Sequence, residues 1–499
     1  MARRILVTLA LLAFFALGFV PVLKMLWDSC HGPQGLTLAA YAPVLGSATE
    51  RLQLWHSLLL ALGAVGLAVL VAVPHVLLTE RTDLPLGALC SAMGVVPLLL
   101  PPILVAFAWL DLLPLSSFWG SILLLGLSHS PLVSVLLARG LRNIDGRLYE
   151  AALLARGRAA AERTLLRLLL PDLLAGALLV LVFVLSEHGV PEFLSVKGKN
   201  WFVYSEAIFL KYANRGAAAV QGGAEATATS VPLLLLTVPA VLLCVRYRRR
   251  GELATLLSDF RPLPRRRTGR LRLPGLLFEL LYLGAAIAVP LWGMLRWSAG
   301  ARSAHGASLA TAVQSFRNAL LQAGDDLVFT LGASAVAALL CLAVALPIGH
   351  AIARSARLGR WLESLAVLPI AVPGILLGIG LVRLWNAGLW PLHGAMGAVY
   401  DSFWMLPLSY AARFAPLAVL SVANAVRRVP MELEEASVLS GRGATARGLR
   451  VTLPLLLPAA CSAATLAFTL SMRELDLAVT NPAGNHAVVR RVATTTRET

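Results

Sequence analysis

The sequence is that of a long, apolar and basic chain. It has 499 residues, of which 58% are hydrophobic and 14% charged, and 43 Lys and Arg against 26 Asp and Glu give a formal net charge of +17 at pH 7. A water-soluble chain carries about a quarter charged residues, so this composition excludes a soluble enzyme, a disordered chain and a secreted disulfide scaffold. The five cysteines are scattered, with no CxxC pair, and offer neither a disulfide framework nor zinc-ligand spacing.

Long apolar stretches occur along the whole chain. A helix that crosses a bilayer needs about 20 largely apolar residues, because lipid offers the backbone no hydrogen-bond partners. Eleven spans are predicted, at 5–24, 53–77, 86–112, 119–138, 172–189, 231–246, 274–297, 327–353, 362–387, 402–426 and 455–475. The first is too long for a signal-peptide core and has no A-x-A-like cleavage site, so it is expected to remain as a span. We therefore expect an all-α polytopic membrane protein.

Prolines and a glycine interrupt two of these spans, at Pro97, Pro101 and Pro102 and at Pro369, Pro373 and Gly374. They are expected to kink helices rather than to end them.

The basic residues predict the orientation of the chain. Arginines are concentrated between spans, at 139–167, 246–272 and 427–450, and with the N-terminus inside these segments share the cytoplasmic side with Arg3 and Arg4. This is the distribution that the positive-inside rule requires. The positive charge is thus explained by topology, and we expect anionic membrane lipids but no nucleic acid as partners.

An internal repeat divides the chain. The stretch 96–103 matches 368–375, Pro74 matches Pro347, and 183–186 matches 468–471, with a nearly constant offset between the two members of each match. The pattern predicts two parallel repeats of about six transmembrane helices, residues 1–247 and 273–499, with the last helix of the second repeat missing from the eleven predicted. The basic linker 248–272 is interpreted as a solvated tether against anionic lipid.

Two loops on the predicted cytoplasmic side share a pattern. The second reads Glu435-Ala436-Ser437-Val438-Leu439-Ser440-Gly441, then nine residues, then Val451-Thr452-Leu453-Pro454; the first has Glu150-Ala151-Ala152 and Gly157, with Leu170-Pro171 downstream. Carboxylates suit the first turn of a helix, and glycine can adopt the positive φ that ends one. Each loop is expected to fold as a short helix-turn-helix that docks into another protein. The alternative is an amphipathic helix lying on the bilayer surface.

The spacing of the second loop resembles the EAA loop of ABC importer permeases, E-A-A-x-x-x-G followed by nine residues and I-x-L-P. Residues 413–418 and 186–191 are similar to fused-type permeases for ferric iron, and then to those for thiamine and phosphonate. The resemblance covers nearly the whole chain and implies a type I ABC importer permease fold in a bacterial inner membrane. It also implies that a periplasmic binding protein delivers a small solute, with ferric iron favoured, and that two cytoplasmic ATP-binding subunits drive transport.

The same resemblance assigns roles to residues of the two loops. Loops 145–171 and 430–458 would dock into the ATP-hydrolysing subunits, and the coupling residues would be Glu150, Ala151, Gly157, Glu435, Ala436 and Gly441. The chain has no G-x-x-x-x-G-K-[ST] motif, so we expect it to bind no cofactor itself and to be a transport subunit rather than an enzyme.

Ionisable residues inside or at the ends of spans are costly and indicate function. Arg413, His129, Glu187 and Glu474 are the candidates for a substrate pathway, and interhelical ion pairs or snorkelling side chains are the alternative. No spacing suits a metal site. Two other classes of function are considered: an ion-gradient-driven secondary transporter, which also favours two parallel helical halves, and an enzyme of lipid or wall synthesis, for which the sequence offers no convergent catalytic set.

Overall fold

The computed structural model describes residues 2–32, 35–113, 116–196, 201–213, 220–252, 261–300, 308–355, 358–386, 393–439, 450 and 452–480. The chain forms two compact units: unit 1 comprises residues 1–48, 207–234 and 322–499, and unit 2 comprises residues 49–206 and 235–321. Each unit therefore combines segments that are distant in the sequence.

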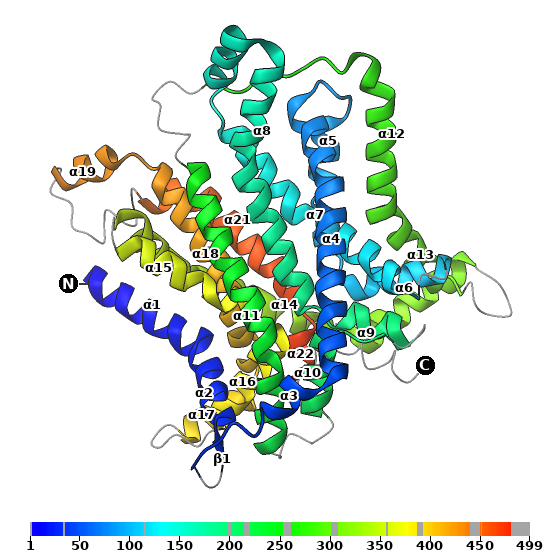
Figure 1. The fold of residues 1–499 in the computed structure, drawn as a ribbon, viewed down its shortest axis with the longest axis vertical. Helices are drawn as coiled ribbons and strands as arrows, with labels where there is room; N and C mark the ends of the chain where they lie inside the picture. Colours follow the sequence, from blue (N-terminus) through cyan, green and yellow to red (C-terminus); the bar gives the residue numbers. More distant parts are fainter. Residues whose placement is uncertain are drawn as a thin grey trace. The chain divides into compact units, whose positions relative to one another are not determined.

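The described part of the chain is almost entirely helical (Figure 1). Nine of its helices are long and apolar enough to cross a membrane, and the number rises to eleven if each of two bent helix pairs counts as one span. The prediction of an all-helical polytopic protein is confirmed. The described residues also include a short two-stranded antiparallel sheet, β1 (His31–Gly32) and β2 (Gly35–Leu36), in which His31 lies opposite Leu36.

Unit 2 comprises two segments, residues 49–206 and 235–321, which lie between the three segments of unit 1 in the sequence. These segments contain α4 (Ala48–Arg81), α5 (Gly87–Met93), η1 (Val96–Leu98), α6 (Pro102–Leu112), α7 (Phe118–Asn143), α8 (Gly146–Ser186), α9 (Gly189–Val196), η3 (Gly269–Leu271), α12 (Arg272–Leu283), the π-helical η4 (Gly284–Ala288) and α13 (Val289–Ser298). The helices α10 (Tyr204–Ala213), α11 (Val220–Glu252) and α14 (Leu309–Arg354) each contribute residues to both units.

Unit 1 joins the N-terminal helices to the C-terminal ones. It contains α1 (Ala2–Gly18), α2 (Val20–Ser29), α3 (Ala42–Gly46), most of α14, α15 (Leu358–Val367), η5 (Leu368–Ala371), α16 (Gly374–Trp385), α17 (His393–Tyr400), α18 (Met405–Arg428), α19 (Met431–Leu439), α21 (Leu453–Met472) and α22 (Asp476–Thr480). Glycines allow this packing: a Cβ at Gly18 would lie 3.0 Å from Pro369 Cγ, and one at Gly380 would lie 3.0 Å from Met25 Sδ.

Small residues form the buried face of one long helix in each unit. In α4 the side chains of Ala64, Ala68 and Ala72 are fully buried at helical spacing. In α14 the buried Ala337, Cys341 and Ala345 occupy the matching positions when Pro74 is aligned with Pro347. Small side chains let helices approach closely in a membrane, where the apolar surroundings provide no hydrophobic drive for association.

The two proline-rich spans are broken rather than kinked. The helix pair Gly87–Leu98 and Pro102–Leu112 is bent by 99°, and the pair Leu358–Ala371 and Gly374–Trp385 by 96°. The prediction that these prolines kink helices without ending them is therefore wrong. Proline lacks an amide hydrogen and disfavours helical geometry in the residue before it, so the helix stops at the first proline group and a new helix begins after Pro101 or Pro373.

The linker also departs from its interpretation as a solvated tether. Residues 248–252 continue α11, and residues 261–268 are hydrogen-bonded to the ends of α4 and α8. The tether interpretation is wrong for residues 261–268, which form part of unit 2.

Candidate functional site

The first of the two predicted loops is a helical hairpin at the start of α8, which we call the α8 hairpin (residues 145–171). Gly157 interrupts the helix with φ 75° and ψ −177°. Tyr149 OH donates a hydrogen bond of 2.6 Å to Glu162 Oε1, 13 residues away. Thirteen residues of a straight helix would separate these groups by about 20 Å, so the chain folds back at Gly157, at the upper end of α8 in Figure 1.

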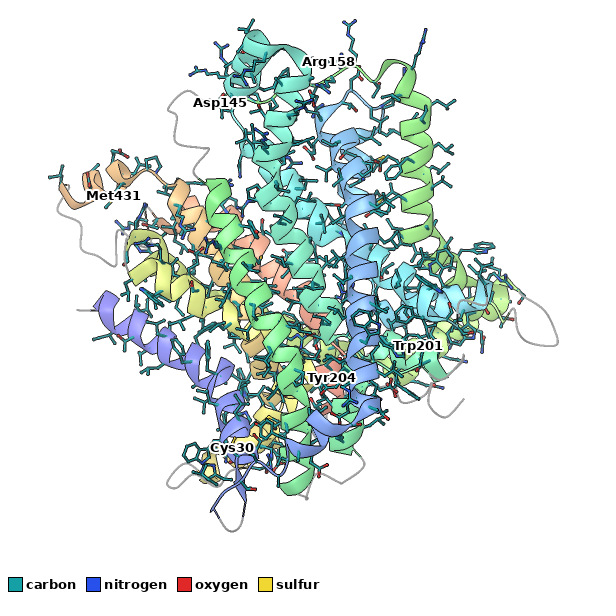
Figure 2. All side chains as sticks on the ribbon, viewed as in Figure 1. Cys30, Asp145, Arg158, Trp201, Tyr204 and Met431 are labelled. Carbon is teal, nitrogen blue, oxygen red and sulfur yellow. The ribbon has the colours of Figure 1, made fainter. Side chains whose placement is uncertain are left out.

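The base of the α8 hairpin is capped and buried, whereas its tip is exposed. Asp145 is 2% exposed and its Oδ1 accepts the Arg147 amide at 2.9 Å, which satisfies one of the free amides at the start of the helix. At the tip Leu154 is 88% exposed and Leu153 is 39% exposed. Figure 2 labels Asp145 and Arg158 at this end of unit 2. An exposed apolar tip of this kind marks a surface for binding protein or membrane.

The predicted coupling residues of this loop lie on the first arm and at the turn. Glu150 and Ala151 are exposed on the first arm, and Gly157 is the turn itself. A Cβ at Gly157 would meet no atom within 4 Å. The glycine is therefore required by its backbone conformation, since the combination of a positive φ with an extended ψ is essentially restricted to glycine.

In the second predicted loop the structure describes α19 and its entry from α18. Glu435 and Ala436 are exposed on α19. Arg354 at the end of α14 donates to Val429 O at 3.0 Å and holds the turn between α18 and α19. Gly441 lies outside the described residues.

Two of the predicted pathway residues meet in unit 1. Arg413 of α18 forms an ion pair with Glu474, with Nε and Oε2 3.3 Å apart and each side chain 9% exposed. A Cβ at Gly374 would overlap with Arg413 Nη1 and lie 2.7 Å from Asp476 Oδ2. We call Arg413, Glu474 and Asp476 the ionic cluster. The interhelical ion pair considered as the alternative for Arg413 is thus present.

The other two predicted pathway residues belong to unit 2. His129 of α7 is 2% exposed, and its Nδ1 lies 3.0 Å from Leu125 O, one turn earlier in the same helix. Glu187 follows the last residue of α8, and its backbone oxygen accepts a hydrogen bond of 2.8 Å from Ser205 Oγ. One ring nitrogen of His129 is therefore within hydrogen-bonding distance of a backbone oxygen of its own helix.

A buried pair that the sequence analysis missed lies in unit 2. His75 Nδ1 of α4 is 2.8 Å from Glu279 Oε2 of α12, and the side chains are 3% and 2% exposed. The Tyr282 ring packs edge-on against His75 at 5.2 Å. The rule that selected His129, an ionisable residue inside a span, would also have selected His75 and Glu279. Their contact was not readable from the sequence because 204 residues separate them.

The described residues offer no metal centre. None of them form a group of three or more His, Cys, Asp or Glu side chains placed to hold a metal ion. The sites described above consist of ion pairs, hydrogen bonds and an exposed apolar hairpin tip.

Comparison with known proteins finds similarity to permease components of transport systems. Residues 342–480 match the family described as "Binding-protein-dependent transport system inner membrane component". The "Fe(3+)-transport system permease protein FbpB 2" of Haemophilus influenzae is 24% identical over 388 residues, which cover 76% of this chain and 71% of that protein. The "Probable ABC transporter permease protein y4fN" of Sinorhizobium fredii is 26% identical over 359 residues, covering 68% of this chain and 60% of the relative.

A further relative matches a smaller part of the chain. The "Molybdenum transport system permease protein ModB" of Mycobacterium tuberculosis is 29% identical over 168 residues, 33% of this chain and 64% of the relative. This chain thus spans less than two thirds of the length of the second and third of these relatives. The matched family region contains the second bent helix pair, α18, the described part of the second loop and the ionic cluster. This region of the chain is thus similar to binding-protein-dependent transport system inner membrane components, the permease subunits of ABC importers.

Proposed function

We propose that this chain is the translocating subunit of an importer for ferric iron, which a periplasmic binding protein delivers and two cytoplasmic ATPase subunits drive. The family match supports the permease role and, in general terms, both kinds of partner. The relative from Haemophilus influenzae named for Fe(3+) transport supports the choice of iron, because its similarity extends over 76% of this chain.

The observation that carries the proposal is the α8 hairpin. It is a compact helix-turn-helix with a capped base, an exposed tip and a glycine turn that no other residue can replace without strain. A rigid projection of this form can transmit a push from a partner into the span that follows it. A flat amphipathic helix on a bilayer surface requires no such reversal of the chain.

We further propose that the chain consists of two parallel repeats, residues 1–247 and 273–499, with the N-terminus in the cytoplasm. The matching bends of 99° and 96° support a duplicated architecture. The buried small residues of α4 and α14, which stand at matching positions of the two sequences, also support it.

The proposed pathway includes Arg413, Glu474, His129 and Glu187. Arg413 pairs with Glu474, and Asp476 lies beside the same guanidinium at Gly374. Carboxylate oxygens suit a hard cation as ligands. This donor chemistry supports a cationic solute.

The α8 hairpin gives the most direct test. Replacing Gly157 with Ala should strain the turn by about 1–3 kcal/mol and lower uptake per ATP hydrolysed several-fold, while membrane insertion stays normal. Gly66→Ala is the matched control, because a Cβ there also meets no atom within 4 Å and its φ is ordinary. Uptake of labelled iron and ATP hydrolysis are measured together in proteoliposomes containing the complete complex.

Three outcomes would contradict the proposal. Wild-type coupling in Gly157→Ala would remove the role of the hairpin. Uptake by the chain alone that stops with an uncoupler and ignores ATP would establish an ion-gradient transporter instead. Uptake of molybdate in preference to iron would overturn the choice of solute.

A further inference from the structure

Residues 261–268, which we call the clasp, run along the end of α4 in unit 2 and lead into α12, as Figure 1 shows at the hairpin end of this unit. The Arg266 amide donates to Arg81 O at 2.8 Å, and the Asp83 amide donates to Arg266 O at 3.0 Å. The amide and hydroxyl of Thr268 donate to Asp83 Oδ1 at 2.6 and 2.7 Å, and these bonds hold the pKa of Asp83 below its ordinary value. The clasp is thus attached to α4 by backbone and side-chain bonds.

The other end of the clasp is attached to the base of the α8 hairpin. Gly146 N donates to Arg261 O at 2.8 Å, and the Arg261 amide reaches Asp145 Oδ1 at 3.4 Å. A Cβ at Gly146 would lie 2.9 Å from Pro262 O, closer than such contacts occur in proteins. The glycine at this position is therefore explained by the close approach of the clasp.

At its centre the clasp joins both arms of the hairpin. Arg266 Nη2 donates to Tyr149 OH at 2.6 Å and forms an ion pair with Glu162. Tyr149 lies on the arm before Gly157 and Glu162 on the arm after it, and the two are bonded to each other. Arg81 stacks over the Tyr149 ring at 4.6 Å and donates to the backbone of the clasp. Arg266 thus ties the two arms to the end of α4, because its guanidinium bonds both arms and its backbone amide bonds Arg81 O.

We infer that the clasp is a working part of the α8 hairpin, and that Arg266 is the positioning residue that fixes the angle between its two arms. The linker between the proposed repeats therefore does more than connect them covalently. It also holds the two arms of the hairpin through the hydrogen bond and the ion pair of Arg266. The structural half of this inference stands without the proposed function, and its consequence for coupling rests on that function.

The first experiment measures the hairpin in the purified full-length chain without partners. Arg266→Ala should raise amide hydrogen exchange of residues 146–162 at least tenfold, because both arms lose their common bond. Arg270→Ala is the matched control: it removes the same charge a few residues away, from an exposed side chain that makes no ion pair within the described part of the chain. Unchanged exchange in Arg266→Ala would overturn the inference, whatever the function of the chain.

The second experiment measures coupling in the complete complex. Arg266→Ala should lower iron uptake per ATP hydrolysed several-fold, and Arg266→Lys should recover part of it, since lysine keeps the charge but loses the forked geometry. If Arg266→Ala speeds amide hydrogen exchange but leaves uptake per ATP hydrolysed unchanged, then Arg266 positions the hairpin but has no role in coupling. If ATP drives no uptake even in the wild type, the proposed function fails while the exchange result still decides the clasp.

A charge exchange keeps the inference testable if single variants fold poorly. Combining Arg266→Glu with Glu162→Arg restores opposite charges around the Tyr149 hydroxyl and should return exchange and coupling towards wild type, whereas each single change should not. Failure of the pair to improve on the single variants would count against a specific clasp.

Discussion

The two bent helix pairs bend by nearly the same angle but have different surroundings. The first pair bends by 99° before Pro102, and the second bends by 96° before Gly374, the residue that matches Pro102 when 96–103 is aligned with 368–375. In the second pair, the space that a Cβ at Gly374 would fill is occupied by the guanidinium of Arg413. The residue that matches Arg413, when 183–186 is aligned with 468–471, is the small buried Ser128. A proline ring is compatible with the first bend, and only glycine with the second.

The remaining members of the ionic cluster show the same contrast. In the alignment that matches Ser128 with Arg413, Glu474 corresponds to Gly189 and Asp476 to Pro191. The bend thus recurs in both helix pairs, whereas the charges of the ionic cluster have no counterpart at the matching positions of the first pair. The difference teaches that the bend does not depend on the ionic cluster, since the first helix pair bends without it.

The largest effect should come from filling the space beside Arg413. Gly374→Ala places a methyl group where Arg413 Nη1 lies, and should cost about 3 kcal/mol from overpacking and a displaced ion pair. The measurement is thermal unfolding of the detergent-solubilised chain. Adding Arg413→Ser together with Glu474→Gln and Asp476→Asn removes the guanidinium without leaving its carboxylates unpaired, and should restore most of the loss. If this combined variant is no more stable than Gly374→Ala, then Arg413 is not the reason for the glycine.

A somewhat smaller effect should follow from removing one charge of the pair. Glu474→Gln removes the carboxylate that pairs with Arg413 and should destabilise the chain by about 2 kcal/mol, because only Asp476 of the ionic cluster then remains to compensate the buried guanidinium. Replacing the whole ionic cluster with uncharged residues, Arg413→Met with Glu474→Leu and Asp476→Asn, should recover stability. Uptake separates the roles: a pathway role predicts a stable triple variant that transports poorly, and full uptake would make the cluster purely structural.

The sequence predicted the helices and the two bends better than it predicted the contacts between helices. The lengths of the apolar stretches predicted eleven spans, because lipid imposes a minimum length on each helix. The two matching proline-containing stretches predicted where both bends lie. Contacts between distant segments were not readable. Arg142 and Arg427 stand at matching positions near the ends of α7 and α18, yet Arg142 pairs with Glu80 of α4 and Arg427 with Glu363 of α15. The repeat predicts two equivalent arginines, but not that each takes its carboxylate from a different helix.

The candidate site shows the same limit. The EAA-like pattern located the α8 hairpin and its glycine turn, since both depend on local backbone preferences. The bonds between Arg266 and the hairpin depend on a segment that is distant in the sequence. From their composition, residues 261–268 were interpreted as a tether against anionic lipid. A run of arginines does not reveal in the sequence whether its side chains are solvated or paired with carboxylates.

The smallest effect should come from the first bend, where no charge of the ionic cluster has a counterpart. Pro102→Gly keeps a conformation that glycine can adopt, and mainly increases the freedom of the unfolded chain, so the loss should be about 0.4–1 kcal/mol. Iron uptake should stay close to wild type, because the ionic cluster lies in the other unit. The check is to measure thermal unfolding and iron uptake of Pro102→Gly and of Gly374→Ala in the same experiment. A loss as large as that of Gly374→Ala, or a loss of uptake at normal stability, would mean that the first bend also has a function beyond turning the chain.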